Sequence, residues 1–174
     1  MQQLLLFAAD GLCGYCLQAF AYLLAIWAMN QRALDWKPLL AGTALFSVIT
    51  FGIRNIPGIS FGFHTILTLI AFIGLAYWLF KTPLYPTVLA VLLTTIATIL
   101  CEAVNVGVLS AIIGAQQFTE AMKDTVTLEG RLGRALLGIP GNLLLCLLIC
   151  LLYRFRKKFL LKVTRRGKTD TQTR

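Results

Sequence analysis

Charged side chains are scarce in this sequence and almost absent from its long apolar stretches. Only 13% of the 174 residues are charged, whereas 58% are hydrophobic. Soluble domains carry about 25% charged residues, and charge as sparse as this cannot cover a surface that faces water. The surface must therefore face lipid, and we expect a multi-pass protein of the cell membrane.

Several catalytic motifs are missing as well. The chain has no P-loop and no glycine-rich phosphate loop, and it has no Ser–His–Asp or Cys–His set with obvious access to water. Its single histidine, His64, stands far in the sequence from the carboxylates that could complete a metal site. We therefore expect a non-enzymatic protein that needs no metal and no cofactor.

What the chain does have is five segments long and apolar enough to cross a bilayer, which takes about 20 residues. They are 4–29, 38–53, 64–80, 86–113 and 132–153. Each is apolar on all sides, as helices in lipid are. No basic residue precedes the first segment, so we expect it to remain as a span and not to be cleaved as a signal peptide. The sequence predicts an all-α bundle of five transmembrane helices, formed by residues 1–153.

Prolines lie where helix ends are expected, with one exception. Pro38 and Pro86 open their segments, where the missing N–H costs little. Pro140 and Gly141 instead lie inside the fifth segment. A proline there removes a helical hydrogen bond, so the pair predicts a kink whose freed carbonyl needs another partner.

Basic residues set the expected orientation. Nine Lys and Arg lie in the tail, 154–174, against the single acid Asp170. With the tail in the cytoplasm, twelve basic residues lie inside and four outside, which follows the positive-inside rule. The N-terminus is then outside. We expect the tail to have no fold of its own, to lie on anionic lipid and to bind no nucleic acid, because it has too few aromatics to stack on bases.

This orientation brings the rare polar groups of the spans to one depth. At 1.5 Å per residue, Asp10 and Glu102 each lie about 9 Å below the outer face. The second span ends at Arg54 on that side, and the third begins there at His64. Ionisable groups in a bilayer are costly unless they are paired or hydrated. The full predicted cluster is Asp10, Arg54, His64, Glu102, Asn105 and Arg134.

Two interpretations of the cluster stay open. Arg54 could pair with Glu102 or Asp10 and simply hold the bundle together, or the groups could line a polar pocket open to the outside. Phe61-Gly62-Phe63-His64 is typical of a bent or partly re-entrant connection at this site. The outer loop, 115–130, is expected to be short, polar and partly helical.

The cysteines offer a different chemistry. Cys13 and Cys16 form a CxxC near the outer end of the first span, and such a pair can pass electrons from an outer partner to a quinone. The outer loops contain no second pair for the relay of a disulfide-forming reductase. Cysteine is also a common small hydrophobe in apolar helices, and we expect Cys146 and Cys150 only to pack.

Short motifs between residues 39 and 113 follow the pattern of a known family. They are Ile53-Arg54, Phe61-Gly62-Phe63-His64-Thr65, Lys81 and, in the following span, Glu102. This pattern resembles the multi-span sensor domains of Gram-positive GHKL-type histidine kinases, which are related to peptide quorum-sensing receptors. In that family a coiled linker, a phospho-accepting histidine and an ATP-binding domain follow the sensor domain.

The chain departs from this family after its last span. Segment 154–174 is too short for a kinase domain, and His64 is on the outer side, so we expect no kinase activity. The resemblance implies a stand-alone relative of the sensing module that signals through a separate kinase or transporter. The alternatives are a substrate-binding membrane subunit of a vitamin-type transporter, hinted at by Gly42 and Ala44 as a docking face, and the CxxC thiol oxidoreductase.

Overall fold

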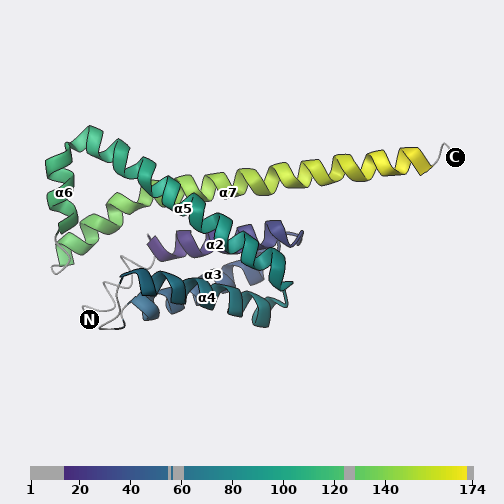
Figure 1. The fold of residues 1–174 in the computed structure, drawn as a ribbon, viewed down its shortest axis with the longest axis horizontal. Coiled ribbons are helices and arrows are strands. Elements are labelled where there is room, and N and C mark those ends of the chain that lie inside the picture. The colour runs from purple at the N-terminus through teal and green to yellow at the C-terminus, as the bar shows by residue number, and fades with distance from the viewer. Residues whose placement is uncertain (1–13, 55, 57–60, 124–127, 172–174) are drawn as a thin grey trace.

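The computed structural model describes residues 14–54, 56, 61–123 and 128–171, and in this part of the chain every regular element is a helix. The helices are α2 (Cys16–Met29), α3 (Trp36–Arg54), α4 (Phe61–Phe80), α5 (Leu84–Ile113), α6 (Ala115–Lys123) and α7 (Leu128–Thr171). Figure 1 shows α2 to α5 side by side in alternating directions, with α6 across one end and α7 projecting far beyond the other. We name the first the α6 end. The opposite end, which holds the turns 30–35 and 81–83, is the turn end.

Four helices are long and apolar enough to cross a membrane. They are Trp36–Arg54, Phe63–Phe80, Leu84–Ile113 and Gly133–Phe155, and they match four of the predicted spans to within two residues at each end. The prediction of an all-helical membrane protein is confirmed to this extent. The first predicted span, 4–29, corresponds to the shorter apolar helix α2, and its residues 4–13 lie outside the described part.

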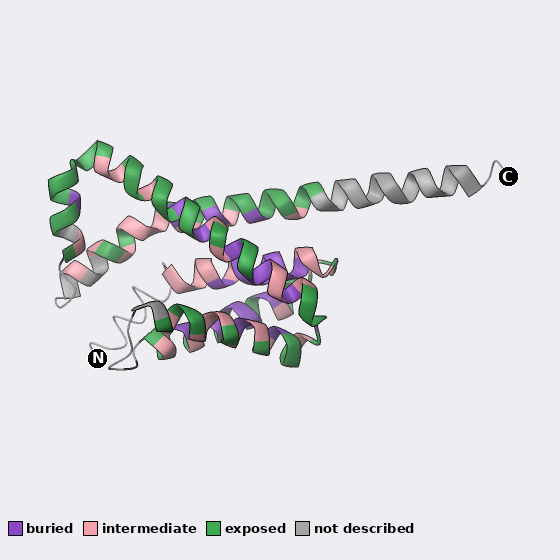
Figure 2. Cartoon of the chain, in the orientation of Figure 1, coloured by how far each residue is buried: buried purple, intermediate pink, exposed green. Residues whose placement is uncertain are grey.

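The central helix of the bundle is α2, although it is the shortest of the apolar ones. It contacts α3, α5 and α7. Eight of its 14 residues are buried, among them Leu23, Ile26 and Trp27. Two apolar clusters meet on it, one shared with α3, α4 and α5 and the other with α5 and α7. Figure 2 shows this concentration of buried residues on α2 and on the facing sides of its neighbours. Because other helices surround α2, its length does not need to match the thickness of the bilayer.

The other helices turn large apolar side chains outward. Ile99 on α5 is 61% exposed and Leu147 on α7 is 58% exposed. An apolar surface of this kind is suited to lipid and not to water. Four exposed aromatic residues lie at the turn end: Trp36, Tyr77, Trp78 and Tyr85. Tyr and Trp gather at membrane–water interfaces because their rings are apolar and carry one polar atom, so the turn end has the composition of such an interface.

Local sequence explains where the helices begin and end at the turn end. The Asp35 carboxylate accepts a hydrogen bond from the backbone N–H of Lys37 at 3.2 Å and so caps α3. Pro38 lies in the first turn of that helix, where its missing N–H has no internal partner to lose. At the end of α2, Gln31 is in the left-handed region with φ of 55°, and the N–H of Arg32 donates to the Trp27 carbonyl at 3.0 Å.

Two expectations about segments flanking the spans are wrong. Residues 61–64 form the first turn of α4 and not a bent or re-entrant connection. Gly62 is tolerated there because the first turn has few internal hydrogen bonds to lose. The tail, expected to have no fold, continues α7 as far as Thr171. Its Lys, Arg and Leu residues are good helix formers, and a helix already established by a membrane span needs no new nucleus.

The segment after α5 is partly helical, as expected. Helix α6 is polar on one side and packs between α5 and α7 at the α6 end. Phe118 is its buried apolar contact, 7% exposed, whereas Glu120 and Lys123 are exposed. α6 therefore rests on the ends of two spanning helices and does not enter the apolar bundle.

Candidate polar site at the α6 end

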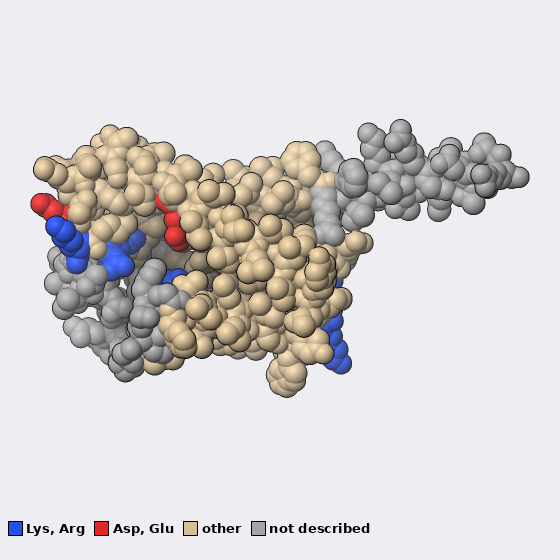
Figure 3. Space-filling model, in the orientation of Figure 1, with Lys and Arg blue, Asp and Glu red and all other residues tan. Residues whose placement is uncertain are grey.

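Charge is confined to the two ends of the bundle. In Figure 3, acidic and basic side chains lie toward the α6 end, basic side chains lie at the opposite end, and the face in view between them shows no charge. The described charges toward the α6 end are Arg54, Glu102, Glu120, Lys123 and Arg134. Three of these, Arg54, Glu102 and Arg134, belong to the predicted polar cluster.

Arg54, the last residue of α3, contacts an aromatic ring. Its guanidinium carbon lies 4.9 Å from the ring centroid of Tyr15, a cation–π distance. The Tyr15 ring also packs edge-on against Phe51, with centroids 6.4 Å apart. The described residues contain no ion pair between Arg54 and Glu102. The other predicted partner, Asp10, lies outside the described residues.

The hydroxyl of Tyr22 lies at the base of this layer. It is hydrogen-bonded to the Thr95 hydroxyl at 2.9 Å, which links α2 to α5. Sequence reasoning missed Tyr22. The sequence feature that could have identified Tyr22 is a hydrogen-bonding side chain in the middle of an apolar span.

A polar stripe on α5 leads from the turn end to this layer. Thr87, Thr94 and Thr98 are buried, and each hydroxyl donates to the carbonyl four residues earlier on its own helix. Continuing at helical spacing, the stripe reaches Glu102 and then Asn105. A threonine whose hydroxyl donates to a backbone carbonyl in this way can be buried without a partner on another helix. Glu102 has no such bond available and is exposed.

Asn105 makes the one side-chain hydrogen bond between α5 and α7 in the described residues. Its Nδ2 donates to the carbonyl of Leu137 at 2.8 Å. Its side chain also lies against Gly141, where a Cβ would come within 3.3 Å of the Asn105 Cβ. The contact therefore lies directly on the helical turn that contains Pro140, and Figure 1 shows α7 changing direction along this part of its length.

The carbonyl that Asn105 satisfies adjoins the one that Pro140 frees. Because proline has no N–H, the carbonyl four residues earlier, that of Leu136, loses its helical partner. The observed acceptor is the next carbonyl, Leu137. The Asn105 amide therefore holds α5 against the proline-containing turn of α7 at the carbonyl next to the freed one.

His64 is the least satisfied member of the predicted cluster. It is half-buried in the first turn of α4, and its Nδ1 is buried with no hydrogen-bond partner. Its backbone carbonyl accepts the Thr68 hydroxyl at 2.8 Å, which is ordinary helix geometry. Arg134 is exposed on the first part of α7. Both therefore lie toward the α6 end, as predicted, without direct contact to Glu102.

The thiol chemistry is only partly within the described residues. Cys13 lies outside them, and Cys16 is a free, half-buried thiol at the start of α2. Cys146 packs against α2, with its Sγ 3.3 Å from the Leu17 carbonyl. In the described part of the chain, no group of three or more His, Cys, Asp or Glu side chains could hold a metal.

A second polar network, at the turn end, was not predicted. The Arg32 guanidinium donates to the Phe80 carbonyl and, at 3.5 Å, to that of Lys81. The Tyr153 hydroxyl of α7 donates to the Arg32 carbonyl at 3.2 Å. The sequence feature that could have predicted it is that two polar turns, Asn-Gln-Arg after the first span and Lys-Thr-Pro after the third, lie at the same end of the bundle. We name this network the turn clamp: Arg32, Phe80, Lys81 and Tyr153.

Comparison of the chain with protein-family models, with curated proteins and with solved structures finds no match.

Proposed function

We propose that the protein is a five-helix membrane sensor or ligand-binding module that signals through a separate protein partner. The α6 end faces outward and binds the ligand, and the turn end and the continuation of α7 face the cytoplasm. This orientation follows the excess of basic residues at the turn end and along α7. α2, together with the residues before it, forms the fifth span. The resemblance to the GHKL-type sensor domains motivates the signalling role.

One observation carries the proposal: the Asn105 contact at the proline-containing turn of α7. It connects the polar stripe of α5, through Leu137 and Gly141, to the one helix that continues beyond the bundle. A ligand shifts a conformational equilibrium only if it binds one state better than the other. A ligand that competes for Asn105, or moves Glu102 beside it, alters the support of the bend and therefore the direction of α7.

Of the two residues that had suggested the docking face of a transporter subunit, Ala44 is exposed and Gly42 is not available for docking. Gly42 is buried inside the bundle, where a Cβ would lie 2.8 Å from the Phe80 ring and 2.9 Å from Leu23. It therefore serves packing between α2, α3 and α4 and does not present a docking face. No described contact favours thiol oxidation over packing for Cys16, so we propose the sensor alone.

The proposal is tested by cross-linking the protein in its native membrane and identifying what copurifies. A histidine kinase or response regulator supports sensing. A transporter ATPase subunit or a thioredoxin-like oxidase would contradict it in favour of uptake or redox chemistry. The same partner then provides the readout for variants of α7.

The decisive variant is Pro140→Ala, which restores an N–H to the bend and should change signalling while leaving the melting temperature in detergent near that of the wild type. The matched control is Leu136→Ala, one turn earlier on the lipid-facing side of α7, where the side chain is 60% exposed. A response that is normal in both variants would leave a structural bundle as the better interpretation.

A further inference from the structure

A cavity lies at the turn end, where a short turn joins α4 to α5. Its volume is about 540 Å³, and it is lined by Tyr77, Trp78, Lys81, Thr82 and Pro83. Trp78 is 78% exposed and Tyr77 is 58% exposed. Because Trp and Tyr gather at the membrane–water interface, we place the cavity at the level of the lipid headgroups and not among the lipid tails.

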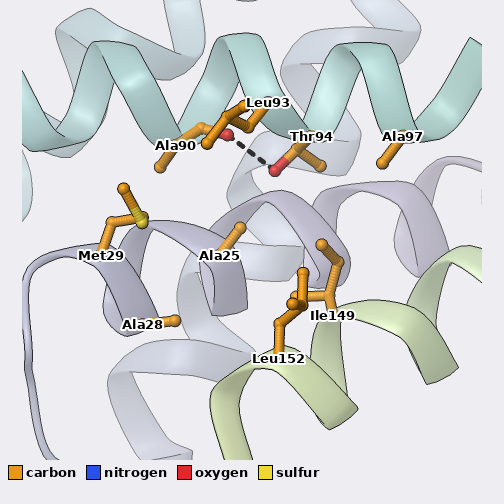
Figure 4. Close-up of a pocket in the computed structure, with 9 residues that line it drawn as sticks. All are labelled: Ala25, Ala28, Met29, Ala90, Leu93, Thr94, Ala97, Ile149 and Leu152. Carbon is orange, nitrogen blue, oxygen red and sulfur yellow. Dashed lines mark hydrogen bonds between the residues drawn. The ribbon is translucent and has the colours of Figure 1, made fainter. Parts of the chain in front are cut away.

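One buried polar atom beside this cavity lacks a partner. The Thr82 side chain is 1% exposed, and its Oγ1 is buried without a hydrogen bond to any described residue. The apolar groove between α2, α5 and α7 in Figure 4 differs in this respect, because its Thr94 hydroxyl donates to the Ala90 carbonyl at 2.7 Å. A buried hydroxyl without a partner is costly, and a ligand that accepts its hydrogen bond would remove that cost.

The start of α5 makes the surroundings of the cavity positive. Pro83 is the N-cap residue of this 30-residue helix, which has no side-chain hydrogen bond at its cap. A helix N-terminus carries roughly half an elementary positive charge and favours anions. Lys81 is exposed and adds a full charge to the lining. The same lysine disfavours a cation, which the two aromatic rings could otherwise attract.

The end of α4 would oppose an anion, but Arg32 offsets its effect. The last carbonyls of a helix form the negative end of its dipole. The Arg32 guanidinium donates to the carbonyls of Phe80 and Lys81, so these acceptors already have a cation beside them. The described charges of the turn end are mostly basic: Arg32, Lys37, Lys81 and Arg154, against Asp35.

We propose that this cavity binds a phosphate group, with Lys81 as its counter-ion and the Thr82 hydroxyl as a hydrogen-bond donor. Phosphate oxygens accept strong hydrogen bonds from such donors, and the hydroxyl hydrogen of a threonine can rotate toward an acceptor. The phosphate belongs either to a lipid headgroup or to a soluble phosphate compound, because both present the same oxygens. The site lies at the opposite end from the ligand site of the proposed function and does not depend on it.

The test is a binding titration of the full-length protein in uncharged detergent, followed by the fluorescence of Trp78. The probes are inorganic phosphate, dihexanoyl phosphatidylglycerol, and dihexanoylglycerol, which has the same chains without phosphate. Subtracting the response of Trp78→Phe removes the signal of the other tryptophans. We expect a saturable change with a phosphate-bearing probe and none with dihexanoylglycerol. Saturation by inorganic phosphate would identify a soluble phosphate as sufficient, and saturation by phosphatidylglycerol alone would identify a lipid headgroup.

Two variants test the residues of the site. Lys81→Gln and Thr82→Val should each weaken binding roughly tenfold, equivalent to about 1.4 kcal/mol. Thr82→Val keeps the shape of the buried side chain and removes a hydroxyl with no described partner to lose, so this variant should fold. The matched control, Lys37→Gln, removes an exposed cation of the same end that does not line the cavity, and it should bind normally.

Three results would overturn the proposal. The first is the absence of saturation with both phosphate-bearing probes, or equal binding of dihexanoylglycerol. The second is an unchanged affinity in both Lys81→Gln and Thr82→Val. The third is an equal loss of affinity in Lys37→Gln, which would show a general attraction of anions to this end in place of a site.

Discussion

The two ends of the bundle are held together in different ways. At the turn end, the turn clamp joins two interhelical turns and α7 through Arg32 and Tyr153, and the Trp27 and Phe80 rings pack at 4.9 Å between centroids. At the α6 end, the described polar contacts are single: Arg54 on the Tyr15 ring, and Asn105 on the Leu137 carbonyl. One end is a network and the other a set of separate contacts.

This difference indicates which end can change shape. Local opening is easiest where few buried contacts and few hydrogen bonds must be lost. Toward the α6 end, Glu102 is exposed, whereas at the turn end the turn clamp fixes the helices against each other. A ligand at the α6 end would therefore move helices about a fixed opposite end.

Breaking the turn clamp should have the largest effect on stability. Arg32→Gln removes the guanidinium from the Phe80 and Lys81 carbonyls and from the Trp27 ring, 5.9 Å away. Hydrogen bonds to charged groups contribute about 1.5–3 kcal/mol, so we expect a loss of about 3 kcal/mol in the free energy of unfolding. Lys37→Gln, an exposed cation near the same turn, is the control. Denaturation in detergent measures both, and equal values would show that the clamp is not stabilising.

Overfilling the packing near the turn end should come next. Gly42→Ala places a methyl group 2.8 Å from the Phe80 ring and 2.9 Å from Leu23, and overpacking a core costs about 1–3 kcal/mol. Gly74→Ala is the matched control, because no atom lies within 4 Å of the added methyl and alanine favours the helix. A Gly42→Ala variant as stable as Gly74→Ala would mean that the end is less tightly packed than described.

A single contact at the α6 end should matter less for stability. Asn105→Leu removes the hydrogen bond to Leu137 and should lower the free energy of unfolding by about 1 kcal/mol. It should also increase hydrogen exchange in the part of α7 around Pro140, because the bend loses its external donor. The control is Val104→Leu, at a neighbouring exposed position of α5. If the hydrogen-exchange protection of α7 is unchanged in Asn105→Leu, the contact with α5 does not stabilise the bend.

The smallest effect is expected at Glu102. One of the two interpretations of the sequence paired Arg54 with Glu102 or Asp10, and disrupting such a pair at a dry site costs about 3–5 kcal/mol. Glu102, however, is exposed and pairs with no described residue. Glu102→Gln and Glu120→Gln should therefore both change the free energy of unfolding by less than about 0.5 kcal/mol. A marked destabilisation by Glu102→Gln alone would restore the buried cluster and weaken the contrast between the two ends.

Hydropathy predicted the helices better than their arrangement. Four of the five predicted spans match helices to within two residues, because a run of about 20 apolar residues is typical of a membrane span. The central place of α2 could not be predicted, since a helix covered by lipid and one covered by protein are both apolar on all sides. The continuation of α7 was missed because charge was taken to end the helix, although Lys and Arg favour helix.

The polar layer was predicted from the depth of each residue below the outer face of the membrane. This depth does not determine which side chains contact each other. The 1.5 Å rise per residue gives the depth of a residue along its helix, but which side chains face each other depends on how the helices rotate about their axes. Arg54 accordingly contacts the Tyr15 ring instead of a carboxylate. The turn clamp was missed for another reason: its acceptors are the backbone carbonyls of Phe80 and Lys81, so the two polar turns could indicate a contact but not its acceptors.

The length of α7 has a mechanical consequence. From Pro140 to Thr171 the helix runs without interruption, a distance of roughly 46 Å at 1.5 Å per residue. A rotation of about 5° at the bend, held rigidly along that length, would displace the far end by roughly 4 Å. The helix would then act as a lever whose pivot lies at Asn105 and Gly141, converting a rearrangement smaller than one atom into a shift that another protein can detect.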